Sequence, residues 1–88
     1  MDNLNFGSVI GFLKRGKRLA RVGWSDKDAF IYYVQTHNRE PLNEVESDIF
    51  GESVECRAYI ALRVTENGST LWTPTTDDVI AEDWYVVE

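Results

Sequence analysis

The sequence predicts a single α+β domain, in which an N-terminal helix packs on a mostly antiparallel sheet of about five strands. Three observations support this fold class. Apolar residues recur at helical spacing over residues 5–15, β-branched and aromatic residues fill 29–35, and an Asn67-Gly68 pair separates two further strand-like segments. Since strands joined by short turns pair in antiparallel fashion, the sheet is expected to be built from sequential hairpins.

The N-terminal helix has recognisable signals at both ends. Asn5 can cap the first turn through its side-chain oxygen, and Gly16 suits the left-handed conformation that ends many helices. Strands are expected next at 18–22 and 29–35. The second of these is apolar on both faces, which predicts that both faces are covered, for instance once by the helix and once by another subunit.

The C-terminal half continues the same alternation. A strand is expected at 58–65, followed by the Asn-Gly turn and a return strand at 70–72. Pro74 then favours an extended chain before it, and Thr75 or Thr76 can cap a short helix that precedes a last strand beginning at Trp84. Residues 36–57 show no clear period, so we interpret them as a functional loop with a short strand or helical turn inside.

Length and charge limit the classes of protein to consider. With 88 residues, the chain forms one domain, 1–88, and a net charge of −6 argues against binding long nucleic acid. The net charge does not exclude a small phosphorylated ligand, because such a ligand needs only a few local hydrogen-bond donors. No apolar run approaches the roughly 20 residues that span a bilayer, and the N-terminus lacks a secretory signal. The single cysteine, Cys56, suits a reducing compartment.

Residues for catalysis or metal binding are sparse. His37 is the only histidine, and no His/Cys cluster has the spacing of metal ligands. The carboxylates of Asp77 and Asp78 are explained by the favourable interaction of acids with the first turn of a helix. The sequence therefore predicts a protein that is not an enzyme, with no catalytic residues, no metal and no cofactor.

Aromatic side chains are the chemistry that the chain does offer. Trp24 and Trp72 both fall where a predicted strand meets a turn, a position from which a ring can face a ligand. Stacking of a nucleobase on such a ring contributes about 1–3 kcal/mol. For Trp24 and Trp72, an equally good interpretation is that their rings fill the core of a small domain. Tyr33 and Trp84 are expected in the core.

Several separately spaced motifs resemble one family. They are Phe6-Gly7, Leu13-Lys14-Arg15-Gly16-Lys17-Arg18, Ala20-Arg21-Val22-Gly23-Trp24, Asn38-Arg39-Glu40-Pro41-Leu42, and the ending from Trp72-Thr73-Pro74 to Asp83-Trp84. In this order they resemble a family of small phage and prophage proteins, once a domain of unknown function, that is associated with the second type of Thoeris anti-defence protein. The match covers both ends and the first two strands.

The resemblance implies binding without catalysis. In Thoeris defence a TIR-domain enzyme converts NAD into a cyclic ADP-ribose signal, and family members bind that signal, such as glycocyclic ADP-ribose, and hold it intact. They form homotetramers with pockets between subunits, and some also sequester cyclic di- or trinucleotides at separate sites. A protein of this kind acts in the host bacterial cytoplasm and has no membrane or long nucleic acid as partner.

The same resemblance indicates ligand-binding residues. Trp24 or Trp72 would stack on adenine, while Arg21, Arg39 and hydroxyl or N–H groups would meet the two phosphates. The full set expected at the site is Arg21, Gly23, Trp24, Ser25, Asn38, Arg39, Trp72, Thr75, Thr76 and Asp78.

Two departures from the family pattern lie beside these residues. Ser25-Asp26 follows the Gly-Trp pair where the family tends to have Asn-Gly, and Ala58-Tyr59 stands where a Pro-His pair is expected. They leave open which linkage isomer is bound. Two other functions stay open as well: a non-enzymatic phage protein that inhibits a host protein by direct contact, and a weak nucleotide hydrolase.

Overall fold

The structure, a computed structural model, describes residues 2–88 and shows the predicted α+β arrangement. Helix α1 (Phe6–Lys14) begins where the sequence indicates, because the Asn5 side chain accepts a hydrogen bond of 2.9 Å from the Ser8 N–H. Gly16 follows the helix with φ +86°, the left-handed conformation that favours glycine. Both predicted end signals are confirmed.

Five antiparallel strands form the main sheet, in the order β6-β5-β2-β1-β7. The strands are β1 (Arg18–Arg21), β2 (Ile31–Val34), β5 (Tyr59–Thr65), β6 (Gly68–Leu71) and β7 (Trp84–Val87). Each predicted strand is present, with ends that differ by one or two residues. The return strand begins earlier than expected, since Gly68 already pairs with Thr65 across a register shift.

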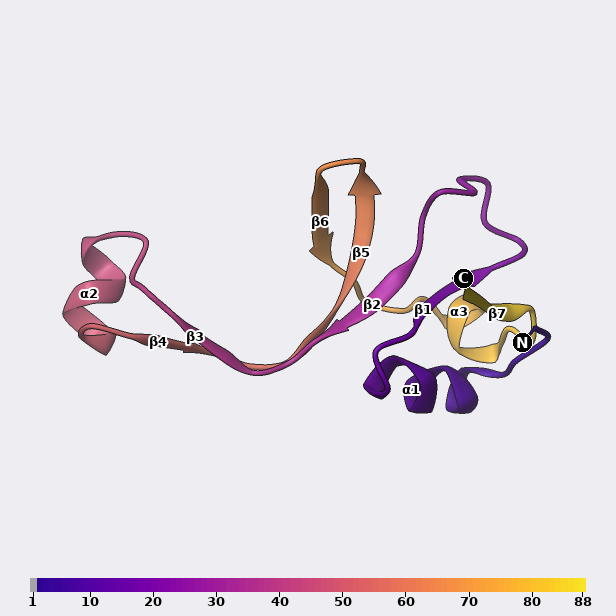
Figure 1. Ribbon diagram of the computed structural model, residues 1–88, viewed down its shortest axis with the longest axis horizontal. Helices are drawn as coiled ribbons and strands as arrows, with labels where there is room; N and C mark the ends of the chain where they lie inside the picture. Colours follow the sequence, from indigo (N-terminus) through magenta and orange to yellow (C-terminus); the bar gives the residue numbers. More distant parts are fainter. Residues whose placement is uncertain (1) are drawn as a thin grey trace.

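Residues 36–57, interpreted from the sequence as a loop with a short strand or helical turn inside, fold into an arm with two paired strands and a helix. Strands β3 (His37–Arg39) and β4 (Val54–Cys56) pair as a second sheet, and helix α2 (Glu44–Phe50) closes its end. We call β3, α2 and β4 the distal arm; it extends away from the main sheet (Figure 1). The radius of gyration, 15.5 Å, exceeds the roughly 12 Å expected for a compact domain of this length.

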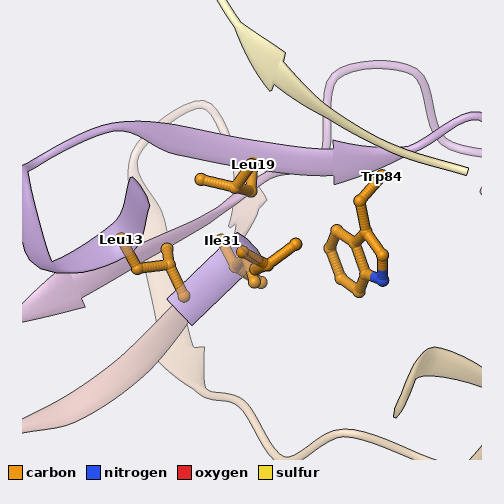
Figure 2. Close-up of a cluster of buried hydrophobic side chains, with 5 residues drawn as sticks. Leu13, Leu19, Ile31 and Trp84 are labelled. Carbon is orange, nitrogen blue, oxygen red and sulfur yellow. The ribbon is translucent and has the colours of Figure 1, made fainter. Parts of the chain in front are cut away.

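The core lies on one side of the main sheet. Val9 and Leu13 of α1 meet Leu19, Ile31 and Trp84 from the strands, all at most 1% exposed (Figure 2). The short helix α3 (Thr76–Ile80) lies on this same side, where the Trp84 indole hydrogen-bonds to its backbone. Strand β2 alternates across the sheet, so Ile31 faces the core while Tyr32 faces away.

Coverage of that opposite face by another subunit remains a prediction. Within residues 2–88, α1 and α3 both pack on the core side, and α2 belongs to the arm. None of these three helices is long and apolar enough to cross a membrane.

Candidate functional site

Three tryptophans from distant parts of the chain meet at one end of the core. The ring centroid of Trp24 lies 5.3 Å from that of Trp84 and 6.5 Å from that of Trp72, and Trp72 and Trp84 are 6.0 Å apart. Their edge-to-face geometry is favourable for aromatic pairs. We call Trp24, Trp72 and Trp84 the indole cluster.

Trp84 is the buried member of the cluster. Its exposed fraction is 0%, and its Nε1 donates a hydrogen bond of 3.0 Å to the Asp78 carbonyl, which satisfies the only polar atom of the side chain. The centroid of the Phe6 ring, at the start of α1, lies 5.7 Å from that of Trp84. The expectation that Trp84 is a core residue is confirmed.

Trp24 and Trp72 combine the two roles considered for them from the sequence, packing in the core and facing a possible ligand. Each packs on the core cluster, yet each remains partly exposed. Together they line a depression of about 250 Å³ with Ser25, Asp26 and Ala29, and Leu62 completes the lining. Two indole walls beside a hydroxyl and a carboxylate form a surface on which a flat ring could stack.

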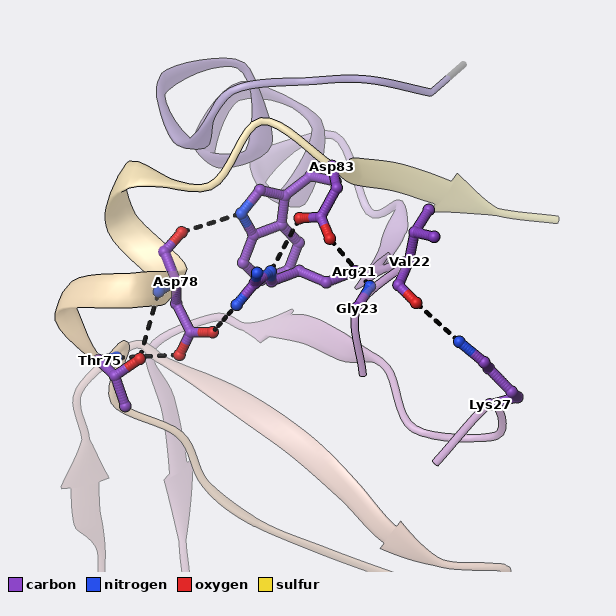
Figure 3. A network of polar contacts seen from close by, with 8 residues as sticks. Arg21, Val22, Gly23, Lys27, Thr75, Asp78 and Asp83 are labelled. Atoms are coloured by element: carbon purple, nitrogen blue, oxygen red, sulfur yellow. Dashed lines mark hydrogen bonds and ion pairs between the residues drawn. The ribbon is translucent and has the colours of Figure 1, made fainter. Parts of the chain in front are cut away.

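An ion-pair network holds the chain beside the cluster (Figure 3). Arg21 donates from Nη1 to Asp78 at 3.0 Å and from Nε to Asp83 at 2.9 Å. The second oxygen of Asp83 accepts the Gly23 N–H at 2.8 Å. The turn that carries Trp24 is therefore fixed to the segment before β7 by charge-assisted hydrogen bonds.

The same network of hydrogen bonds also holds α3 in place. Thr75 caps the helix: its hydroxyl accepts from the Asp78 N–H at 3.2 Å, and its own N–H donates to the Asp78 carboxylate at 2.9 Å. This reciprocal pair is a capping box. Of the two caps that the sequence allowed, Thr75 is the one used, and Thr76 becomes the first helical residue with an exposed side chain.

The surroundings of the Asp78 and Asp83 carboxylates lower their pKa values. Burial of Asp78, which is 7% exposed, would by itself raise its pKa, but hydrogen bonds from Thr75 and Arg21 outweigh burial, and the pKa is lowered. The Arg21 guanidinium lowers the pKa of Asp83, with a further contribution from the Gly23 N–H. Both groups are thus held as carboxylates in the folded protein.

These shifts imply that the protein loses stability in acid. A carboxylate with a lowered pKa stabilises the folded state fully above its unfolded value of about 3.9, and this stabilisation is lost as pH falls through the folded pKa. Urea unfolding is therefore expected to show a smaller free energy of unfolding at pH 3 than at pH 6. The difference should shrink in Asp78→Asn, while Asp77→Asn, on the exposed side of the same turn, serves as the charge control.

An Asp78→Asn variant with the wild-type difference between the two pH values would contradict this assignment. Part of the acid sensitivity should survive in the variant, because Asp83 and Glu46 contribute in the same direction. Arg39 and the Leu42 N–H lower the pKa of Glu46 to about 2.

Two of the expected site residues lie elsewhere. Asn38 and Arg39 belong to β3 in the distal arm, away from the indole cluster in the same chain (Figure 1). Arg39 forms two hydrogen bonds of 2.9 Å with Glu46 of α2, which tie the helix to the strand. The other eight residues gather around the cluster: Arg21, Gly23, Trp24, Ser25, Trp72, Thr75, Thr76 and Asp78.

Asp83 has a role that its sequence position did not indicate. Its carboxylate accepts hydrogen bonds from both Arg21 and the Gly23 N–H. Arg21 pairs with Trp84 across β1 and β7, and this register, which no local sequence signal indicates, brings Asp83 beside Arg21. No group of three or more metal-ligating side chains lies close together in the part of the chain that the structure describes.

The fold and this site define a small α+β protein whose site combines partly exposed indole rings with a charge-paired turn. Comparison with known proteins makes the class specific. The chain belongs to the Tad2-like family, described as the Thoeris anti-defense 2-like domain, whose family model matches residues 4–87. It is 29% identical over 90 residues to Thoeris anti-defense 2 of Bacillus phage SP01, covering 96% of this chain and 94% of that protein.

This family membership confirms the resemblance drawn from the motifs. It supports a phage anti-defence role directed at Thoeris for this chain. The family name fits a protein without catalytic activity.

Proposed function

We propose that this protein binds the cyclic ADP-ribose signal made by Thoeris TIR enzymes, glycocyclic ADP-ribose, and sequesters it without degrading it. Acting in the host bacterial cytoplasm, it would keep the signal from its effector. The observation that supports this most is the depression walled by Trp24 and Trp72. Two indole faces at one opening suit a nucleobase, and each stacking contact contributes about 1–3 kcal/mol.

Phosphate contacts would come from donors at the end of β1 and on the turn that carries Trp24. Arg21 carries a positive charge that Asp78 and Asp83 already balance, so its remaining Nη2 would serve a phosphate mainly as a positioned hydrogen-bond donor. Lys27 lies nearby with its ammonium on the Val22 carbonyl at 2.7 Å, an exposed contact that a phosphate could replace. The Ser25 hydroxyl adds a neutral donor.

Assembly would complete the site. At about 250 Å³, the depression is smaller than the roughly 300–1,000 Å³ of most small-molecule sites. We propose a homotetramer in which the pocket forms between subunits, so that Asn38 and Arg39 of one arm reach the indole cluster of another copy. In such an assembly all ten expected residues would meet at one site, although a single chain separates them.

Retention without reaction is the proposed mechanism. A closed pocket with pre-organised contacts slows dissociation, and slow release is what sequestration requires. Cyclic di- or trinucleotides are proposed as further ligands at separate sites, as the family resemblance implies.

The second candidate is inhibition of a host protein by direct contact. One observation favours it: the distal arm exposes large apolar side chains, which is typical of a surface that binds another protein.

A heat-release experiment separates these functions. The protein is incubated with glycocyclic ADP-ribose and, in parallel, with a panel of cyclic di- and trinucleotides, freed of unbound ligand, and then denatured by heat. Recovery of the intact ligand is expected. A chemically altered product would indicate an enzyme, and no uptake from any sample would favour the contact inhibitor; a protein-free sample controls for breakdown in the heat step.

A further inference from the structure

The depression beside the indole cluster has one charged group in its lining. Asp26 supplies this group, and the other lining residues are all neutral: Trp24, Ser25, Ala29, Leu62 and Trp72. An ionised carboxylate only accepts hydrogen bonds, and the proposed ligand carries negative phosphates. A carboxylate at this opening would therefore repel the charged part of the ligand and attract a part that can donate a hydrogen bond.

The charge of Asp26 is not neutralised by a neighbouring cation. Asp26 takes part in none of the ion pairs formed among residues 2–88. Lys27, the next residue along the chain, has its ammonium on the Val22 carbonyl at 2.7 Å. Arg63 lines a neighbouring hollow together with Asp26, but its guanidinium stacks on the Phe30 ring, with the guanidinium carbon 5.6 Å from the ring centroid. The Asp26 carboxylate is thus available to a ligand.

The turn that contains Asp26 holds its carboxylate in place. The Oδ1 atom accepts a hydrogen bond of 2.9 Å from the Asp28 N–H, and the backbone carbonyl of Asp26 accepts one of 3.3 Å from the Ala29 N–H. Side chains of Asp and Asn commonly stabilise turns in this way. No hydrogen bond from residues 2–88 reaches the second oxygen, Oδ2. An acceptor that is already oriented loses less conformational entropy when a ligand binds to it.

A nucleoside offers neutral hydrogen-bond donors at two places. One is the exocyclic amino group of the base, and the other is the pair of ribose hydroxyls. A hydrogen bond from either donor to a carboxylate is charge-assisted, and it is stronger than a bond between two neutral groups. A carbonyl oxygen in the same position would face a second acceptor, so neither oxygen would have a donor.

We propose that Asp26 is a specificity-determining residue of this depression. It accepts a hydrogen bond from a neutral donor of a stacked nucleoside, which is either the amino group of the base or a ribose hydroxyl, and it keeps the phosphates away from the opening. The phosphates are then left to Arg21 and Lys27, neither of which lines the depression. This inference rests on the proposed function, because it concerns the same site, and it names the chemical group that the site selects.

Titration with three uncharged nucleosides tests this selectivity. Adenosine has both kinds of donor, inosine has a carbonyl in place of the amino group, and dideoxyadenosine lacks the vicinal ribose hydroxyls. Binding to the isotope-labelled protein is followed by NMR through the indole N–H signals of its three tryptophans. Adenosine is expected to bind, and at least one analogue to bind about 10-fold more weakly, the low end for a bond to a charged group because Asp26 is exposed. The analogue that loses affinity identifies the donor.

Asp26→Asn separates selectivity from folding. Asparagine keeps a side-chain oxygen for the Asp28 N–H, so the turn should persist, but the charge and one acceptor are removed. The variant is expected to lose most of its preference for adenosine over the weaker analogue. Asp28→Asn is the matched control, because it removes one charge from the same turn at a residue outside the lining of the depression. This control should keep the preference of the wild-type protein.

Thermal unfolding checks that the variants are folded, and Asp26→Ser, whose hydroxyl can also accept in the turn, is a second neutral variant for the same titrations. The role of Asp26 is overturned if wild-type protein binds no adenosine, if it binds all three nucleosides equally, or if the Asp26 variants discriminate as the wild type does. Uptake of glycocyclic ADP-ribose without discrimination among nucleosides would leave sequestration standing and remove this role. Discrimination without uptake would contradict the sequestration alone.

Discussion

Replacing Trp84 with alanine is expected to lower the free energy of unfolding by about 3–5 kcal/mol, the range for a fully buried tryptophan. Its ring is inaccessible and contacts both the core and the other two indoles. The cavity would also remove the support beneath Trp24 and Trp72. Since small domains have a total stability of roughly 5–15 kcal/mol, this one change is expected to bring the protein close to unfolding at 37 °C.

Urea denaturation followed by circular dichroism measures this effect. Trp84→Phe separates the contribution of the ring's volume to stability from that of its hydrogen bond. Phenylalanine keeps much of the volume but leaves the Asp78 carbonyl without its donor. It is expected to cost about 1–3 kcal/mol. Val79→Ala, at a position about half exposed, is the control. A loss below 1 kcal/mol for Trp84→Ala would show that this ring is not central to the core.

Trp24→Ala and Trp72→Ala are each expected to weaken binding of the cyclic ADP-ribose signal strongly while the protein still assembles. Loss of one stacked ring costs about 1–3 kcal/mol, or roughly 5–150-fold in affinity. Each change also opens one wall of the depression that these rings line. The two residues together are expected to account for recognition of the base.

Titration calorimetry and gel filtration on the same samples check this prediction. Because both rings also pack on the core cluster, the alanine variants should lose some stability, and an assembled, folded sample is required before binding is compared. Trp24→Phe and Trp72→Phe retain a ring and are expected to bind more strongly than the alanine variants. Full uptake by both alanine variants would place the base elsewhere.

Local sequence signals were enough for much of the fold. Asn5 and Gly16 delimit the first helix because capping and left-handed backbone are decided within a few residues. The run of β-branched and aromatic residues in 29–35 and the Asn67-Gly68 turn located the sheet in the same way. Motif spacing, which samples the whole chain, was enough to indicate the family.

The arm and the site were decided by tertiary structure. Val45 and Ile49 lie on an exposed helix, so the apolar residues of 36–57 have no core to face, and their pattern predicted only a loop with a short strand or helical turn inside. Arg21 and Asp83 are 62 residues apart and meet only because β1 pairs with β7 in one register. The sequence shows which side chains can bind a ring or a charge. Which of them already have partners within the chain depends on strand pairing, and strand pairing is a property of the folded chain.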